Sequence, residues 1–104
     1  MLEALGTTLR AAREEADVSL RDVSIAADIV ESSLSRLERG QITDAPRKLP
    51  QIMAGYAQAT GIPVADLMRL WVARLAEDEA REALTAARRA EARRRRRASR
   101  GAAS

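Results

Sequence analysis

The sequence predicts an all-α protein of five helices, the last of which continues as an extended C-terminal helix with an arginine-rich tail. Its 104 residues suffice for one compact domain and a long helix. Phe is absent, and there is one Trp and one Tyr, so the core has to be built from Leu, Ile, Val, Ala and Met. These residues recur at helical spacing with few β-branched runs, which favours helices over strands.

The first two helices are predicted from an apolar face and a cap. The first covers residues 2–16 and is broken at residues 17–18. Ser19 is suited to cap the second helix, residues 20–26, because its hydroxyl can accept a hydrogen bond from a free backbone N–H. Asp22 lies three residues on, as in a capping box. The apolar face of the first helix consists of Leu5, Leu9, Ala12 and Ala16.

A turn at residues 27–30 separates the second helix from the third, which ends at Gly40. Glycine suits the left-handed conformation that closes a helix, because it has no Cβ to clash. Two short helices on a tight turn can set the second into the major groove of DNA while the first braces across the backbone. Residues 19–40 therefore predict a helix-turn-helix. The small or apolar side chains that such a contact needs are Val23, Ala27, Ile29, Leu34 and Leu37.

Proline and glycine mark the fourth and fifth helices. Residues 41–49 predict a loop, after which Pro50 fits the first turn of the fourth helix and Gly61 ends it. Pro63 starts the fifth helix. The predicted core residues of these two helices are Ile52, Met53, Tyr56, Ala57, Thr60, Val64, Leu67, Met68, Trp71 and Leu75.

Beyond residue 75 large apolar residues almost vanish, which predicts a projecting helix. We expect a helix-turn-helix domain over residues 1–75, and a projecting helix with a basic tail over residues 76–104 that frays into Arg93–Arg97 and residues 99–104. A seam of alanines lets two helices approach closely but buries little area, so a paired helix and a single solvated helix both remain open. The alanines of the seam are Ala76, Ala80, Ala83, Ala87 and Ala90.

Charge is distributed unevenly along the chain. Residues 88–104 hold eight arginines against one acid, Glu91, while residues 1–87 carry a net charge of −4. A basic tail of this kind indicates a polyanion partner, nucleic acid first. A solvated end without a partner is the other interpretation.

Several functional classes are not expected from the composition. The chain has neither Cys nor His, so it lacks thiolate metal ligands and the commonest general base. Its carboxylates are scattered, with no glycine-rich phosphate loop near them, so we expect neither an enzyme nor a cofactor. No segment approaches the roughly 20 apolar residues that span a membrane. The first 20 residues lack a secretory signal pattern. We expect a cytoplasmic, nucleoid-associated protein.

Residues 19–40 closely resemble the Cro/repressor (XRE-type) helix-turn-helix family. Ser19 matches the family's cap, Ile29 its apolar turn residue, and residues 35–40 its closing Ser-x-Leu/Ile-Glu-x-Gly. The resemblance covers about residues 5–70 and implies a sequence-specific DNA-binding domain. The residues that carry it outside the motif are Leu9, Arg10, Arg13, residues 56–62, Asp66 and Leu67.

Three positions depart from the family pattern. Leu20 replaces the glutamine that contacts phosphate, and Asp28 replaces a glycine of the turn. Asp tolerates the left-handed conformation better than most residues, so the turn can survive. Val30 stands where Ser or Thr commonly caps the third helix. Asp28 and Glu31 have the spacing of a capping box, so a third helix that begins two residues early is an alternative.

The resemblance implies roles for individual side chains. The residues expected to face base edges are Glu31, Ser32, Ser35 and Arg36. Arg36 can donate two hydrogen bonds to guanine, and Glu31 can accept one from cytosine or cap its own helix. Phosphate contacts are expected from Arg21, Ser33, Arg39, Arg47, Lys48, Arg93, Arg94, Arg95, Arg96 and Arg97. Glu38 is expected to pair with Arg13 and tie the first helix to the third.

Two functional hypotheses follow from this sequence. The first is a repressor or autoregulator that binds a palindromic operator in double-stranded DNA as a homodimer. The second is an interaction protein whose projecting helix binds a protein partner, such as a toxin or a polymerase subunit. The acidic body and the missing glutamine at Leu20 favour the second slightly.

Overall fold

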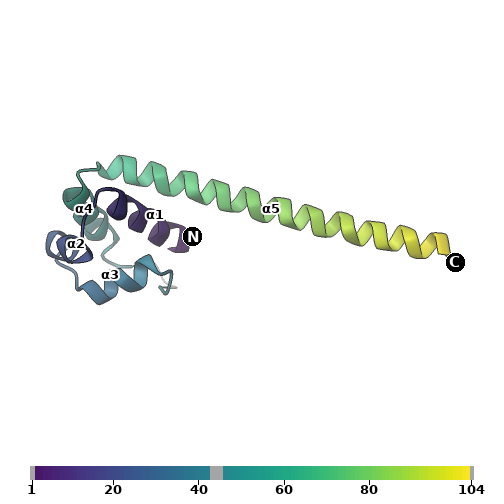
Figure 1. The fold of residues 1–104 in the computed structure, drawn as a ribbon, viewed down its shortest axis with the longest axis horizontal. Coiled ribbons are helices and arrows are strands. Elements are labelled where there is room, and N and C mark those ends of the chain that lie inside the picture. The colour runs from purple at the N-terminus through teal and green to yellow at the C-terminus, as the bar shows by residue number, and fades with distance from the viewer. Residues whose placement is uncertain (1, 43–45, 104) are drawn as a thin grey trace.

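The computed structural model describes residues 2–42 and 46–103, and these residues form helices without any strand (Figure 1). The all-α prediction is confirmed. Helices α1–α4 and the beginning of α5 form a compact body, from which the rest of α5 projects (Figure 1). The molecule measures 68 × 23 × 22 Å. The helices are α1 Leu2–Glu15, α2 Leu20–Ala27, α3 Glu31–Glu38, α4 Leu49–Thr60 and α5 Val64–Ala103.

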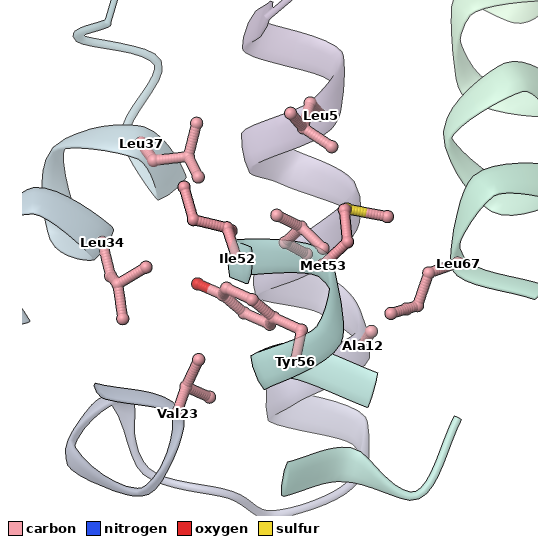
Figure 2. Close-up of a cluster of buried hydrophobic side chains, with 10 residues drawn as sticks. Leu5, Ala12, Val23, Leu34, Leu37, Ile52, Met53, Tyr56 and Leu67 are labelled. Carbon is pink, nitrogen blue, oxygen red and sulfur yellow. The ribbon is translucent and has the colours of Figure 1, made fainter. Parts of the chain in front are cut away.

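One aliphatic cluster holds the body together, and the Tyr56 ring lies within it (Figure 2). Each large side chain buried in this way contributes about 1.5–3 kcal/mol relative to an exposed one. All five helices supply at least one member, so the cluster fixes α2 and α3 against α1 and α4. Its buried members are Leu5, Leu9, Ala12, Val23, Leu34, Leu37, Ile52, Met53, Tyr56 and Leu67.

Two glycines inside helices allow the helices to cross at close range. A Cβ on Gly6 would overlap the backbone of Leu37, and one on Gly55 would overlap Ala27. Helix α1 therefore packs directly against α3, and α4 against α2. These contacts could not be predicted from the sequence, because a glycine within a helix ordinarily only weakens it.

The caps set the boundaries of α2 and α3. The Ser19 hydroxyl accepts from the backbone N–H of Asp22 at 3.1 Å, and the Asp22 carboxylate accepts from the N–H of Ser19 at 3.3 Å. Asp28 ends α2 in the left-handed conformation, with φ 55°. An N-cap needs extended backbone, so Asp28 cannot begin α3, and the alternative early start is wrong. Val30, with φ −61° and ψ 142°, is the N-cap instead.

The buried stripe of the fifth helix is narrower than predicted. Leu67 is buried and Trp71 and Leu75 are half-buried, but Val64 and Met68 are 40% and 39% exposed. The predicted buried stripe is therefore too wide, because α5 packs mainly against α1 and α4. Elsewhere in the body, four residues that were expected to pack on apolar faces are half-buried: Ala16, Ile29, Ala57 and Thr60.

The predicted fraying of the C-terminus is also wrong. Helix α5 continues through Arg93–Arg97 to Ala103, while Ser104 and residues 43–45 of the predicted loop lie outside the described residues. Residues 64–100 contain neither Gly nor Pro and are rich in alanine, the best helix former. Ion pairs within the helix join Asp66 to Arg69 at 2.9 Å and Glu91 to Arg95 at 2.8 Å.

The backbone of α5 runs unbroken past residue 75, where the sequence suggested a change from domain to projecting helix. Side chains beyond residue 78 are exposed up to residue 100, apart from the half-buried alanines Ala90 and Ala92. In the described residues, no helix is both long and apolar enough to span a membrane.

Candidate nucleic-acid interface

Helices α2 and α3 form a helix-turn-helix whose contact is apolar. The buried apolar side chains of the two helices are Val23 and Ala27 in α2 and Leu34 and Leu37 in α3. The turn is held by backbone and side-chain hydrogen bonds together. The Ile29 N–H donates to the Ser24 carbonyl at 3.2 Å, and the Ser24 hydroxyl donates to the Ile29 carbonyl.

Helix α4 supports the turn through a side chain that the sequence analysis missed. The Gln51 amide donates to the Ala27 carbonyl at 2.6 Å and lies 3.4 Å from the Asp28 carbonyl. The end of α2 leaves carbonyls without helical partners, and Gln51 satisfies one of them. A signal for this role is hard to read from sequence, because 24 residues separate donor and acceptor.

The outer face of α3 is polar and accessible. Glu31, Ser32 and Arg36 are exposed, while Ser35 is half-buried. In the major groove, side chains of this kind can donate to or accept from base edges. The four residues expected to read bases therefore share one short helix, although Ser35 presents less surface than the others.

Several of the expected phosphate contacts gather beside α3. A surface hollow of about 690 Å³ lies between the α2–α3 turn and residues 46–48. Ser33, Arg36, Arg47 and Lys48 line it, together with Asp28. The arrangement brings three cations from two parts of the chain to one edge of α3.

The other two arginines of the body that are expected to contact phosphate lie elsewhere on its surface. Arg21 is exposed on α2, and Arg39 is exposed at the end of α3, where its Nε donates to the Ser35 carbonyl at 3.3 Å. Neither lines the hollow. The body residues expected to contact phosphate therefore lie in two groups, one at the hollow and one outside it.

Arg13 and Glu38 form a bidentate ion pair that joins α1 to α3. Arg13 Nε donates to Glu38 Oε2, and Arg13 Nη2 donates to Oε1, both at 2.9 Å. Arg13 Nη1 also donates to the Val18 carbonyl at 3.1 Å, which holds the α1–α2 connection. The Glu38 side chain is only 5% exposed. The hydrogen bond to Glu38 raises the pKa of Arg13.

The Tyr56 hydroxyl completes this buried group by donating to Glu38 Oε2. Burial, followed by the bond to Glu38, raises the pKa of the Tyr56 phenol. Among the described residues, no buried side-chain nitrogen or oxygen lacks a hydrogen-bond partner. The sequence predicted that Tyr56 lies in the core but did not identify its polar partner. The spacing of apolar residues indicates that a ring is buried, but it does not show which group its hydroxyl bonds.

Arg93–Arg97 are not brought together with α3. All five are exposed on the projecting part of α5. Helix α5 lies on the side of the body opposite α3, with α1 between them, and its free end points away (Figure 1). The body and the tail therefore present cations on two separated surfaces.

Known proteins share both the sequence pattern and the fold. Residues 4–70 match the family described as helix-turn-helix domain. Two crystal structures of the clp gene regulator ClgR from Corynebacterium glutamicum are similar, each at 32% identity. The first covers 84% of this chain and 89% of the ClgR chain, with a TM-score of 0.68. The second covers 70% and 91%, with a TM-score of 0.56. No curated protein matches the chain.

These matches agree with the geometry of α2 and α3 and with the motif at residues 35–40. The family match covers more than half of the chain and includes the whole of α2 and α3. The chain belongs to the helix-turn-helix domain family.

Proposed function

We propose that this protein is a sequence-specific transcriptional regulator, acting as a repressor or autoregulator on a palindromic operator that it binds as a homodimer. The observation that carries the proposal is the exposed polar face of α3 beside the cationic hollow of Arg36, Arg47 and Lys48. Residues 1–87 are acidic overall, so the concentration of cations at this edge of α3 does not follow from the overall charge of the body. The name of ClgR as a gene regulator supports the same role.

Base recognition is assigned to the exposed face of α3. Arg36 is suited to guanine because its guanidinium can donate to O6 and N7 together. Glu31 can accept from the cytosine amino group, while Ser32 and Ser35 can donate or accept. Because Glu31 lies in the first turn of α3, it is close to where recognition helices of this type usually contact bases.

Phosphate contacts set the orientation of α3 in the groove. Arg47 and Lys48 precede α4, Arg21 lies on α2 and Arg39 ends α3. Ser33 lines the same hollow as Arg47. Such contacts carry no sequence information, but each neutralised phosphate releases a counterion and makes binding dependent on salt.

A homodimer would place two α3 helices on two half-sites. Operator palindromes mirror a protein two-fold axis, with half-sites about 34 Å apart. The exposed apolar side chains of α5 supply a surface that a second copy could cover. They include Met68 at 39%, Leu70 at 49% and Val72 at 59% exposure. We propose neither an enzymatic activity nor a cofactor.

A gel shift with DNA from upstream of the protein's own gene tests the proposal. We expect a discrete shifted band that unlabelled upstream DNA removes, while an excess of unrelated DNA of equal length does not. Footprinting the same fragment should show two protected half-sites. Equal competition by both DNAs would contradict a sequence-specific function.

The second candidate is an interaction protein, favoured by the long exposed part of α5, on which Leu84 is 52% exposed. Leu20 also lacks the polar group that contacts phosphate in similar proteins. If this is the function, no upstream or genomic duplex should be bound specifically. A purified partner encoded beside the gene should then bind the full chain, and it should not bind a chain ending at residue 75.

A further inference from the structure

We propose that the arginine cluster of α5 is a second, sequence-independent DNA-binding site, which holds a DNA segment other than the one bound by α3. The arginine cluster is defined as Arg88, Arg89, Arg93–Arg97 and Arg100. The inference rests on the proposed function, since it takes α3 to be the surface that binds the operator.

The charge of the arginine cluster remains available for a partner. All of its arginines are exposed. Among the described residues, the one ion pair within it joins Arg95 to Glu91 at 2.8 Å, with 78% and 55% of these side chains exposed. A solvent-exposed pair of this kind is worth little and opens readily. The cluster therefore offers a dense positive charge to a polyanion.

The distribution of the charge around the helix favours duplex DNA over other polyanions. Successive residues turn by about 100°, so Arg93–Arg97 surround α5 and leave no apolar face of the kind that a membrane-surface helix needs. No aromatic residue follows Trp71, so the cluster has no ring on which single-stranded bases could stack. Duplex DNA carries one charge per about 1.7 Å of its axis, close to the helix rise of about 1.5 Å per residue.

The position of the arginine cluster separates it from the operator. Leu67 is buried in the core, and Arg95 follows it on the same helix by a length of about 42 Å at 1.5 Å per residue. Helix α5 also lies across the body from α3 (Figure 1). The shorter extents of the molecule are 23 and 22 Å, which is more than an arginine side chain reaches. A duplex seated against α3 therefore lies beyond the cluster of the same copy.

Helix α5 has no feature that would bend the cluster back toward α3. Sharp kinks occur at proline, at glycine or where the helical ladder is interrupted. Residues 64–100 contain neither Pro nor Gly. Asp78 and Arg81 pair at 3.6 Å within this part of the helix. The helix thus holds the two DNA-binding surfaces apart.

A two-duplex capture experiment tests this arrangement. The full chain is bound to an immobilised short duplex that carries the operator, and a second, fluorescent duplex without an operator is added. A chain ending at Ala92 removes Arg93–Arg97, and a variant with all five changed to lysine keeps their charge. In parallel, the affinity for a single short operator duplex is measured by anisotropy at several salt concentrations.

We expect the full chain and the lysine variant to capture the second duplex, and the shortened chain to capture at least tenfold less. For the single operator duplex, shortening the chain should change the affinity by less than about twofold. The slope of log affinity against log salt concentration should also stay unchanged, because the loss of one phosphate contact would alter this slope by about one.

Three results would overturn the inference. Equal capture by the shortened chain would mean that the helix-turn-helix units of a dimer do the bridging. A weaker affinity and a smaller salt slope on the single duplex would place the cluster on the operator DNA itself. Tighter binding of single-stranded RNA or anionic vesicles at matched phosphate concentration would assign the cluster to another partner. If the immobilised duplex fails to retain the full chain, the proposed function itself fails at the first step.

Discussion

At the scale of single residues, Glu38 joins three helices of the body through its buried carboxylate. Its carboxylate is almost fully buried and accepts from Arg13 twice and from Tyr56 once. A buried carboxylate is costly unless its hydrogen bonds are complete. The two partner residues come from α1 and α4, while Glu38 itself ends α3. One side chain therefore fixes the recognition helix against two others.

Replacing Glu38 with alanine should destabilise the protein before it alters DNA specificity. The variant leaves the Arg13 guanidinium and the Tyr56 hydroxyl without their acceptor, and we expect a loss of about 1–3 kcal/mol in the free energy of unfolding. Urea unfolding measures it. Glu14→Ala is the matched control, because Glu14 pairs with Arg10 on the exposed surface of α1. Equal urea midpoints for Glu38→Ala and the parent would mean that the buried pair contributes nothing.

The Tyr56 phenol should make stability depend on alkaline pH. Its pKa is raised in the folded protein, whereas in the unfolded chain it is about 10. The folded state therefore keeps the proton after the unfolded state has lost it. Stability is complete below pH 10 and falls above it, with a slope approaching about 1.4 kcal/mol per pH unit. Urea unfolding between pH 8 and pH 11 measures the slope. Tyr56→Phe should flatten it, and a slope that persists in this variant would point to another group.

Arg36 is the side chain whose loss should change sequence preference. Arg36→Ala removes the bidentate donor, so we expect a loss of about 1–3 kcal/mol at one guanine position and little change at other positions. Binding to a set of single-base operator variants measures the effect. Arg39→Ala is the control, and it should weaken binding to every duplex by a similar factor. The same uniform weakening by Arg36→Ala would make Arg36 a phosphate contact.

At the scale of helices, caps were predictable and close crossings were not. Ser19 with Asp22, and Gly61 with Pro50, could be identified because each acts within a few residues of the boundary that it sets. Asp28 was ambiguous, since one residue could end α2 or begin α3, and only its left-handed backbone decided between them. Gly6 and Gly55 act on helices distant in sequence, so their role requires the packed structure.

Gly55→Ala tests the close crossing of α4 and α2. Helix propensity alone predicts that this change stabilises α4 by up to about 1 kcal/mol. The new Cβ would overlap Ala27, and forcing the helices apart should cost about 1–3 kcal/mol instead. Thermal unfolding gives the sign. Ala54→Gly, at an exposed position of the same helix, reports propensity without a clash. A Gly55→Ala variant more stable than the parent would contradict the crossing.

At the scale of the whole molecule, the chain divides by charge and by contact. Residues 1–87 are acidic overall and contain the core, while the arginine cluster lies on a part of α5 that touches nothing in the body. The uneven distribution of charge can be read directly from the sequence. The helical tail was not predicted, because five adjacent arginines repel one another and this repulsion destabilises a helix. The helix propensity of alanine and the ion pair of Glu91 with Arg95 stabilise it.

This balance makes the end of α5 sensitive to its ionic surroundings. A chain ending at Ala92 should keep the urea midpoint of the parent, because the removed residues make no contact with the core. The difference between the far-ultraviolet circular dichroism spectra of the two chains then reports residues 93–104 alone.

Repulsion among Arg93–Arg97 acts between neighbouring turns and is screened over about 10 Å at 0.1 M salt. We expect the helical signal in the difference spectrum to grow from 10 mM to 300 mM salt, and to grow at low salt when duplex DNA neutralises the arginines. A difference spectrum that changes with neither salt nor DNA would mean that the arginine charges do not influence the helix. A lower urea midpoint for the shortened chain would mean that the tail stabilises the core.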